Sequence, residues 1–275
     1  IPGIEDVAKW ASEYFWSDLY KPYPGFERKK PVGSTELEST MRVFMSGDID
    51  TIEEWINLNH KKYNKSLHYV TGDSLLLSWI KCRSHFQTQL PRMKQMAPTD
   101  LQPELQRMEN SLGVWRQAIG LLAQKAPKQL NLTDFKGQTP LMLAAEDGDS
   151  ELMQTFLDAG ADSDLKDFQG RSALHAAVKS HDKASIDVLL NHADDLTPKT
   201  VDGRSPLHTA AWSGNSYAIE RIIASSPQLA WQRDANGMTP LELAEFYSET
   251  PEALSYLNEE LAREGRAPVH VGQIE

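Results

Sequence analysis

The sequence has 275 residues, of which 40% are hydrophobic and 24% are charged, and this balance argues against wholesale disorder. No apolar run approaches the ~18 residues that a membrane-spanning helix needs. The lone cysteine, Cys82, excludes an internal disulfide framework and a multi-cysteine zinc site. The net charge is −11, and it is uneven: residues 134–264 carry −13, whereas residues 1–133 carry +2.

The acidic balance of residues 134–264 disfavours direct nucleic-acid binding, because phosphate backbones would be repelled. It is compatible with a basic protein partner, and the alternative is that the acidic residues only keep the surface soluble. The single cysteine favours the cytoplasm. Because the sequence begins at Ile1 rather than Met, we expect a processed or shortened chain, so a removed signal peptide and a secreted form stay open.

Taken in chain order, the first predicted element is an amphipathic helix over residues 3–20, where apolar and aromatic residues recur at helical spacing. We expect it to cover the open end of the core that follows, with a binding anchor as the alternative. The prolines and glycine of residues 21–25 end the helix, and a basic linker continues to about residue 33.

Residues 34–66 read as two helices joined by Gly47-Asp48, with Ile52, Trp55, Ile56 and Leu58 supplying the second helix. Residues 67–133 read as a second pair, whose connection is expanded between about residues 84 and 112. The spacing predicts two lengthened helices that form a protruding hairpin, with Gln102-Pro103-Glu104 as a helix start. A functional role for this insertion and a merely ornamental one both stay open.

A seven-residue pattern then recurs through residues 134–264. It begins at Thr139-Pro140-Leu141, and copies start at Ser172, Ser205 and Thr239, in steps of 33, 33 and 34 residues. Each copy follows a glycine by two positions, which suits a tight turn with positive φ. Thr139 or Ser172 can cap the helix that follows, and proline fits its first turn.

This pattern resembles the ankyrin repeat, which has a period of about 33 residues and a T-P-L-H-x-A signature. The resemblance implies an all-α solenoid of helix-turn-helix units with short β-turn fingers. The predicted boundaries are an N-terminal extension at 1–33, a degenerate repeat at 34–66, an expanded repeat at 67–133, regular repeats at 134–166, 167–200 and 201–233, a C-terminal cap at 234–264 and a tail at 265–275.

The resemblance also implies where the functional residues lie. His175 and His208 occupy the signature histidine, which ties neighbouring turns by hydrogen bonds, whereas Met142 and Glu242 replace it in the flanking repeats, so we expect weaker junctions there. Binding residues are expected on the concave side, at the turn tips and first helices. The predicted protein-binding residues are Phe135, Lys136, Glu146, Asp147, Phe168, Gln169, Arg171, Lys179, Asp202, Arg204, Trp212, Asn236, Met238, Phe246 and Tyr247.

Catalytic and metal-binding patterns do not rise above chance in this sequence. Cys82 and His85 share a helix face, but nothing supplies an orienting third group, and the Asp-rich turns near Gly148 and Ser163 offer too few oxygen ligands for calcium. We therefore predict a non-catalytic, monomeric protein-binding module without cofactor or metal. It would act as an inhibitor or immunity-type protein, or as an adaptor or effector. The alternative is an enzyme with a cryptic site in residues 1–133.

Overall fold

The computed structural model describes residues 48–63, 73–96, 99, 102–192, 196–247, 256–259 and 262–263. Every regular element in these residues is a helix, which confirms the predicted all-α fold. The chain divides into two compact units, residues 1–135 (unit 1) and residues 136–275 (unit 2), which are described separately. The helix and linker expected at 1–33 and the tail expected at 265–275 lie outside the described residues.

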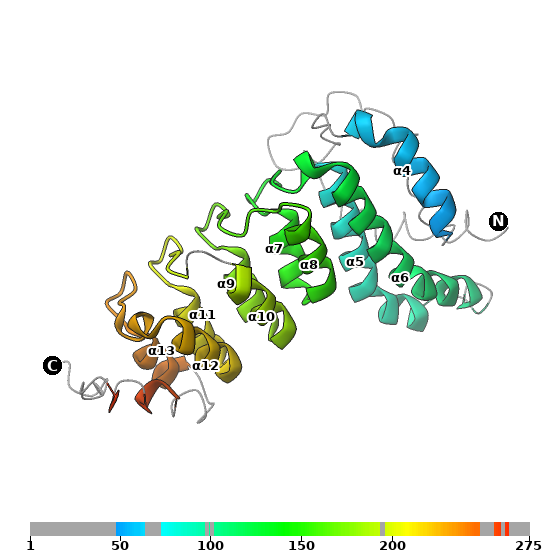
Figure 1. The fold of residues 1–275 in the computed structure, drawn as a ribbon. Helices are drawn as coiled ribbons and strands as arrows, with labels where there is room; N and C mark the ends of the chain where they lie inside the picture. Colours follow the sequence, from blue (N-terminus) through cyan, green and yellow to red (C-terminus); the bar gives the residue numbers. More distant parts are fainter. Residues whose placement is uncertain are drawn as a thin grey trace, which may run out of the picture. The chain divides into compact units, whose positions relative to one another are not determined.

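In the described residues of unit 1, the structure has three long helices and, after them, one short 3-10 helix (Figure 1). They are α4 (Ile49–Tyr63), α5 (Leu75–Met96), α6 (Gln102–Lys125) and η3 (Pro127–Gln129). Helix α6 packs against both α4 and α5, so the expanded segment is present as two lengthened, paired helices. Helix α6 begins at Gln102 as predicted, whereas Pro91 lies inside α5 without ending it.

The core of unit 1 is built from large apolar side chains on all three helices. Trp55 of α4 lies beside Trp79 of α5, with ring centroids 5.8 Å apart, and Phe86 of α5 lies 6.1 Å from Trp115 of α6. The four residues assigned to the second helix of the degenerate repeat all lie in α4. Ile52 and Ile56 are buried, whereas the side chain of Leu58 is 77% exposed and does not belong to the core.

Two polar contacts close the expanded repeat within unit 1. The backbone N–H of Leu76, in the first turn of α5, donates to Oε1 of the buried Gln129 at 2.9 Å, although the two residues are 53 positions apart. The ammonium of Lys81 lies 3.0 Å from the Asp73 carboxylate and 2.9 Å from that of Asp134. These contacts join the start of α5 to the end of the repeat. The two ends of the repeat are therefore held together in spite of the long hairpin between them.

Unit 2 is a stack of helix pairs in two layers (Figure 1). The first helices are α7 (Pro140–Glu146), α9 (Ala173–Ser180), α11 (Pro206–Ser213) and α13 (Pro240–Tyr247). The second helices are α8 (Ser150–Asp158), α10 (Lys183–His192) and α12 (Ser216–Ser225), and a 3-10 helix, η4 (Pro227–Trp231), follows α12. Each first helix packs on the next first helix, and each second helix on the next second helix.

Small residues set the spacing within the first-helix layer. Ala144, Ala177, Ala210 and Ala244 are fully buried, as is Leu207 of the recurring motif. Alanine lets helices approach closely, and the leucine then fills the space between neighbouring repeats. A single repeat could not bury these side chains alone, so the stack is the folding unit.

The helix caps follow the sequence with one exception. The Thr139 side chain accepts a hydrogen bond from the N–H of Met142, and Asp149 and Asn215 cap α8 and α12 in the same way. Gly148 and Gly214 stand between the two helices of their repeats with φ of 67° and 68°. His181 occupies the same repeat position with φ of 61°, a left-handed conformation that is strained for a residue with a Cβ.

Candidate protein-binding surface

Each repeat of unit 2 begins with a tight turn that we call a finger. The complete fingers are residues 167–171, 200–204 and 234–238, and the first finger enters unit 2 at residues 136–138. In each complete finger the first N–H donates to the fifth carbonyl, for example from Asp167 to Arg171 at 2.9 Å. The Asp167 carboxylate also accepts from the N–H groups of Gln169 and Arg171, at 2.9 and 2.8 Å. The turn is thus held by its own aspartate.

Successive fingers are joined by backbone hydrogen bonds. Phe168 donates to the carbonyl of Lys136 at 3.0 Å, Val201 to Gln169 at 2.8 Å and Ala235 to Asp202 at 2.8 Å. The approach is close enough that a Cβ on Gly170 would stand 2.6 Å from the Lys199 carbonyl oxygen. The finger row is therefore a continuous backbone scaffold, on which side chains at the tips are held at fixed spacing.

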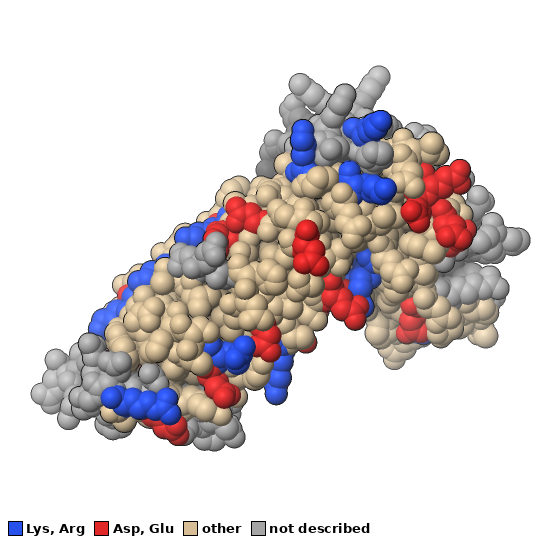
Figure 2. Space-filling model, viewed as in Figure 1, with Lys and Arg blue, Asp and Glu red and all other residues tan. Residues whose placement is uncertain are grey.

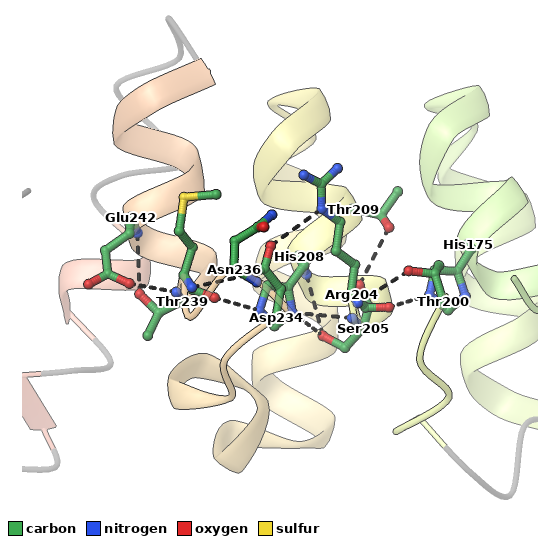
Figure 3. A network of polar contacts seen from close by, with 11 residues as sticks. His175, Thr200, Arg204, Ser205, His208, Thr209, Asp234, Asn236, Thr239 and Glu242 are labelled. Atoms are coloured by element: carbon green, nitrogen blue, oxygen red, sulfur yellow. Dashed lines mark hydrogen bonds and ion pairs between the residues drawn. The ribbon is translucent and has the colours of Figure 1, made fainter. Parts of the chain in front are cut away.

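Two histidines hold the fingers to the first helices (Figure 3). Nδ1 of His175 accepts from the N–H of Ser172 at 3.1 Å, and its Nε2 donates to the carbonyl of Arg204 in the next finger at 3.2 Å. His208 repeats this arrangement with Ser205 and Met238. Both rings tie neighbouring repeats as predicted, and each also accepts a hydrogen bond at the start of its own helix, which was not predicted.

Burial keeps these rings neutral. It lowers the pKa of His175 to about 4 and also lowers the pKa of His208. A neutral ring with its proton on Nε2 satisfies both contacts, because a backbone N–H can only donate and a carbonyl oxygen can only accept. A second proton on Nδ1 would remove the acceptor for the N–H of Ser172. These histidines are structural groups rather than acid–base catalysts.

The repeat that carries glutamate in place of histidine is still capped. Oε2 of Glu242 accepts from the N–H of Thr239 at 2.6 Å, and Arg233 lies 3.3 Å from the same oxygen (Figure 3). Glutamate at this helix position forms a capping box, so the start of α13 is capped, while the weaker junction expected at Glu242 stays a prediction. Glu242 ends the described stack of first helices, and no repeat follows it along the described residues.

The expected binding residues at the finger tips are exposed. Phe168 is 74% exposed and the neighbouring tip residue Val201 is 71% exposed. Lys136, Gln169, Asp202 and Asn236 are exposed at the next position of their fingers. Phe135 belongs to unit 1, where its ring, 41% exposed, lies beneath the ammonium of Lys81 at 5.1 Å.

The last turns of the first helices carry a second exposed row. Glu146, Lys179, Trp212 and Phe246 occupy one repeat position; Trp212 is 42% exposed and Phe246 is 67% exposed. Phe246 contacts Tyr247 edge to face, with centroids 4.7 Å apart. Asp147, exposed, stands at the Tyr247 position of its own repeat.

The finger and helix positions lie on one face of the first repeats. Gln138 donates to Glu146 at 2.7 Å, and a guanidinium nitrogen of Arg171 lies 4.0 Å from the same carboxylate. We call the surface formed by the finger tips and the last turns of the first helices the candidate face.

Three of the predicted binding residues also make contacts within the stack of repeats. Arg171 is paired with Asp167 at 2.7 Å, Arg204 approaches Asp234 of the next finger at 3.5 Å, and the carbonyl of Met238 accepts from His208. Substituting either arginine would therefore disturb the stack as well as the candidate face, whereas the carbonyl of Met238 remains in any variant.

Sequence reasoning missed the residues that precede the fingers. Lys166, Lys199 and Arg233 occupy this position in three consecutive repeats, and all three are exposed. The signal was readable, because a basic residue recurs at a fixed repeat position within the acidic half of the chain.

Two other features bear on chemistry. Cys82 is buried, 3% exposed, in the core of unit 1, where a thiol is shielded from substrates. Among the described residues, no group of three or more His, Cys, Asp and Glu side chains could hold a metal ion. A search of the same residues found no helix long and apolar enough to cross a membrane.

Part of the chain is similar to a known family of repeats. Residues 116–200 match the family model described as ankyrin repeats (3 copies). A comparison of the sequence with curated proteins found no match.

Proposed function

We propose that this ankyrin-repeat chain binds another protein through the candidate face and has no catalytic role of its own. Ankyrin repeats generally mediate protein–protein interaction, which supports the class of function. The observation that carries the proposal is the exposure of Phe168, Trp212, Phe246 and Tyr247 on a hydrogen-bonded scaffold. Large aromatic side chains on a rigid backbone are the usual anchors of protein interfaces, because little conformational entropy is lost on binding.

The proposal is tested by site-specific photo-crosslinking in the native cell or extract. A photoreactive phenylalanine analogue replaces Trp212 in one variant and Phe168 in another, and a third variant carries it at Glu220, an exposed residue of the second helix α12. We expect the two candidate-face variants to capture the same protein and the Glu220 variant to capture none of it. Equal capture at all three positions would refute the assignment of the face.

A matched pair of alanine variants gives the magnitude for the captured partner. Trp212→Ala should weaken binding by at least about tenfold, roughly 1.4 kcal/mol, with the unfolding midpoint nearly unchanged. Glu220→Ala should leave the affinity unchanged. If Trp212→Ala instead lowers stability while the folded protein binds normally, Trp212 is a packing residue. The α5–α6 hairpin is then the next candidate interface, and deleting it should abolish binding.

Binding alone does not distinguish the two biological roles that we propose. An inhibitor or immunity-type protein would abolish the activity of its partner in a stoichiometric mixture. An adaptor or effector would leave that activity intact and bring a third protein into the complex. An activity assay of the captured partner, with and without this chain, separates the two.

A further inference from the structure

The charges of unit 2 are segregated. The finger edge, which we define as residues 136–138, 166–171, 199–204 and 233–238, holds six of the ten Lys and Arg residues found in 136–264 but only three of the 22 Asp and Glu residues. The six basic residues are Lys136, Lys166, Arg171, Lys199, Arg204 and Arg233. An acidic unit therefore carries one basic edge.

The structure strengthens this contrast, because most acidic groups of the finger edge turn inward. Asp167 and Asp234 are buried, each 6% exposed, and each is engaged by an arginine. Lys136, Lys166 and Lys199 are exposed, and Asp202 is the one exposed acidic residue of the finger edge. Because Asp167 and Asp234 are paired with Arg171 and Arg204, the exposed charge of the finger edge is carried mainly by the three lysines, against Asp202 alone.

Figure 2 shows Lys and Arg side chains following one another along the side of unit 2 that carries the fingers. Apolar tips stand among these cations: Phe168 lies between Lys166 and Arg171 in sequence, and Val201 between Lys199 and Arg204. Both tips are more than two-thirds exposed. The edge therefore alternates positive charge with apolar surface at the repeat spacing.

We propose that the finger edge binds an acidic segment of the partner protein, in which apolar residues alternate with carboxylates. This inference rests on the proposed function and specifies the chemistry of the partner. It replaces the expected basic partner, which was based on the summed charge of residues 134–264. At physiological salt, exposed charges act over about 8 Å, so a docked segment feels the local edge rather than the distant acidic helices.

A protein segment fits this edge better than a nucleic acid. Residues 136–264 carry a net charge of −12, which opposes a long, uniformly charged polyanion whose field extends over the whole unit. A short acidic segment would meet the exposed lysines and the two apolar tips, with Asp202 as the one exposed acidic residue of the finger edge. Its apolar side chains would cover Phe168 and Val201.

The test measures fluorescence anisotropy with three labelled probes: a peptide of alternating Glu and Leu, its Lys and Leu counterpart, and single-stranded oligo(dT). The variant Lys166→Glu/Lys199→Glu reverses two charges of the finger edge. The control variant Lys128→Glu/Lys183→Glu makes the same change in net charge at two exposed residues outside the fingers. Circular dichroism melts of both variants identify any loss of folding.

We expect the Glu and Leu peptide to bind the unaltered protein, with an affinity that falls as the salt concentration rises. The finger-edge variant should bind this peptide at least tenfold more weakly, a loss of about 1.4 kcal/mol. The control variant should retain the affinity. Preference for the Lys and Leu peptide would overturn the proposal in favour of a basic partner, and finger-dependent binding of oligo(dT) alone would overturn it in favour of a nucleic acid. Equal losses in both variants, or no binding of the Glu and Leu peptide, would also overturn it, while Trp212-dependent capture of a protein would still stand.

Discussion

His175 should make the stability of unit 2 depend on pH in a defined window. In the folded chain burial lowers its pKa to about 4, whereas in the unfolded chain a histidine titrates near pH 6.5, as an unperturbed imidazole does. The unfolded chain therefore binds this proton first as the pH falls. The stability that depends on neutral His175 is fully present above about pH 6.5 and is lost progressively down to about pH 4.

The size of this effect follows from the difference between the two pKa values. Each pH unit of difference is worth about 1.4 kcal/mol, so the full loss is about 3 kcal/mol, of which about 2 kcal/mol falls between pH 7.5 and pH 5. The main cause is burial, which disfavours the charged ring, and a proton on Nδ1 would in addition remove the acceptor for the N–H of Ser172.

The assay compares urea unfolding of the unaltered chain and of His175→Gln at pH 7.5 and pH 5. Glutamine can accept and donate without titrating, so the variant should lose about 2 kcal/mol less than the unaltered chain on acidification. Carboxylates contribute equally to both proteins and cancel in this difference. A control, His192→Gln, changes an exposed histidine of α10 and should follow the unaltered chain. The same acid sensitivity in all three proteins would refute the assignment.

Two further predictions concern the packing and the turns of unit 2. Leu207→Ala should lower the free energy of unfolding by about 2–5 kcal/mol in chemical denaturation, because Leu207 is fully buried between repeats, and a loss below about 1 kcal/mol would count against the register. His181→Gly should raise the unfolding free energy by about 1 kcal/mol, because His181 has the φ of 61° that Gly148 and Gly214 adopt without a Cβ; an unchanged or lower midpoint would show that its side chain stabilises the turn.

The repeating pattern predicted most of the scaffold from sequence because each part of it has a local cause. Thr139 caps its helix, Gly170 permits a turn and the alanines permit close packing, and each effect acts over a few residues or one repeat. The repeat step of 33 residues places His181 where the neighbouring repeats have Gly148 and Gly214, but the left-handed backbone of His181 was not predicted, because a histidine usually avoids positive φ.

The candidate face was less predictable, because its properties depend on which side chains turn inward. From the net charge of the repeats we expected an acidic surface. In the structure, however, Asp167 and Asp234 are buried, whereas Lys166 and Lys199 are exposed. The sequence alone did not decide whether Phe246 and Tyr247 are exposed for binding or packed under a C-terminal cap, since an aromatic residue suits either role.

The bond between Leu76 and Gln129 bears on how repeats of this kind tolerate insertions. It closes a loop of 53 residues, whereas His175 and His208 close loops of 29 and 30 residues between repeats. Closing the longer loop costs only about 0.5 kcal/mol more in chain entropy, because that cost grows with the logarithm of length. The turn between α5 and α6 is therefore a natural place to graft or remove sequence, and a chimaera with a foreign helical hairpin there should keep its repeats intact.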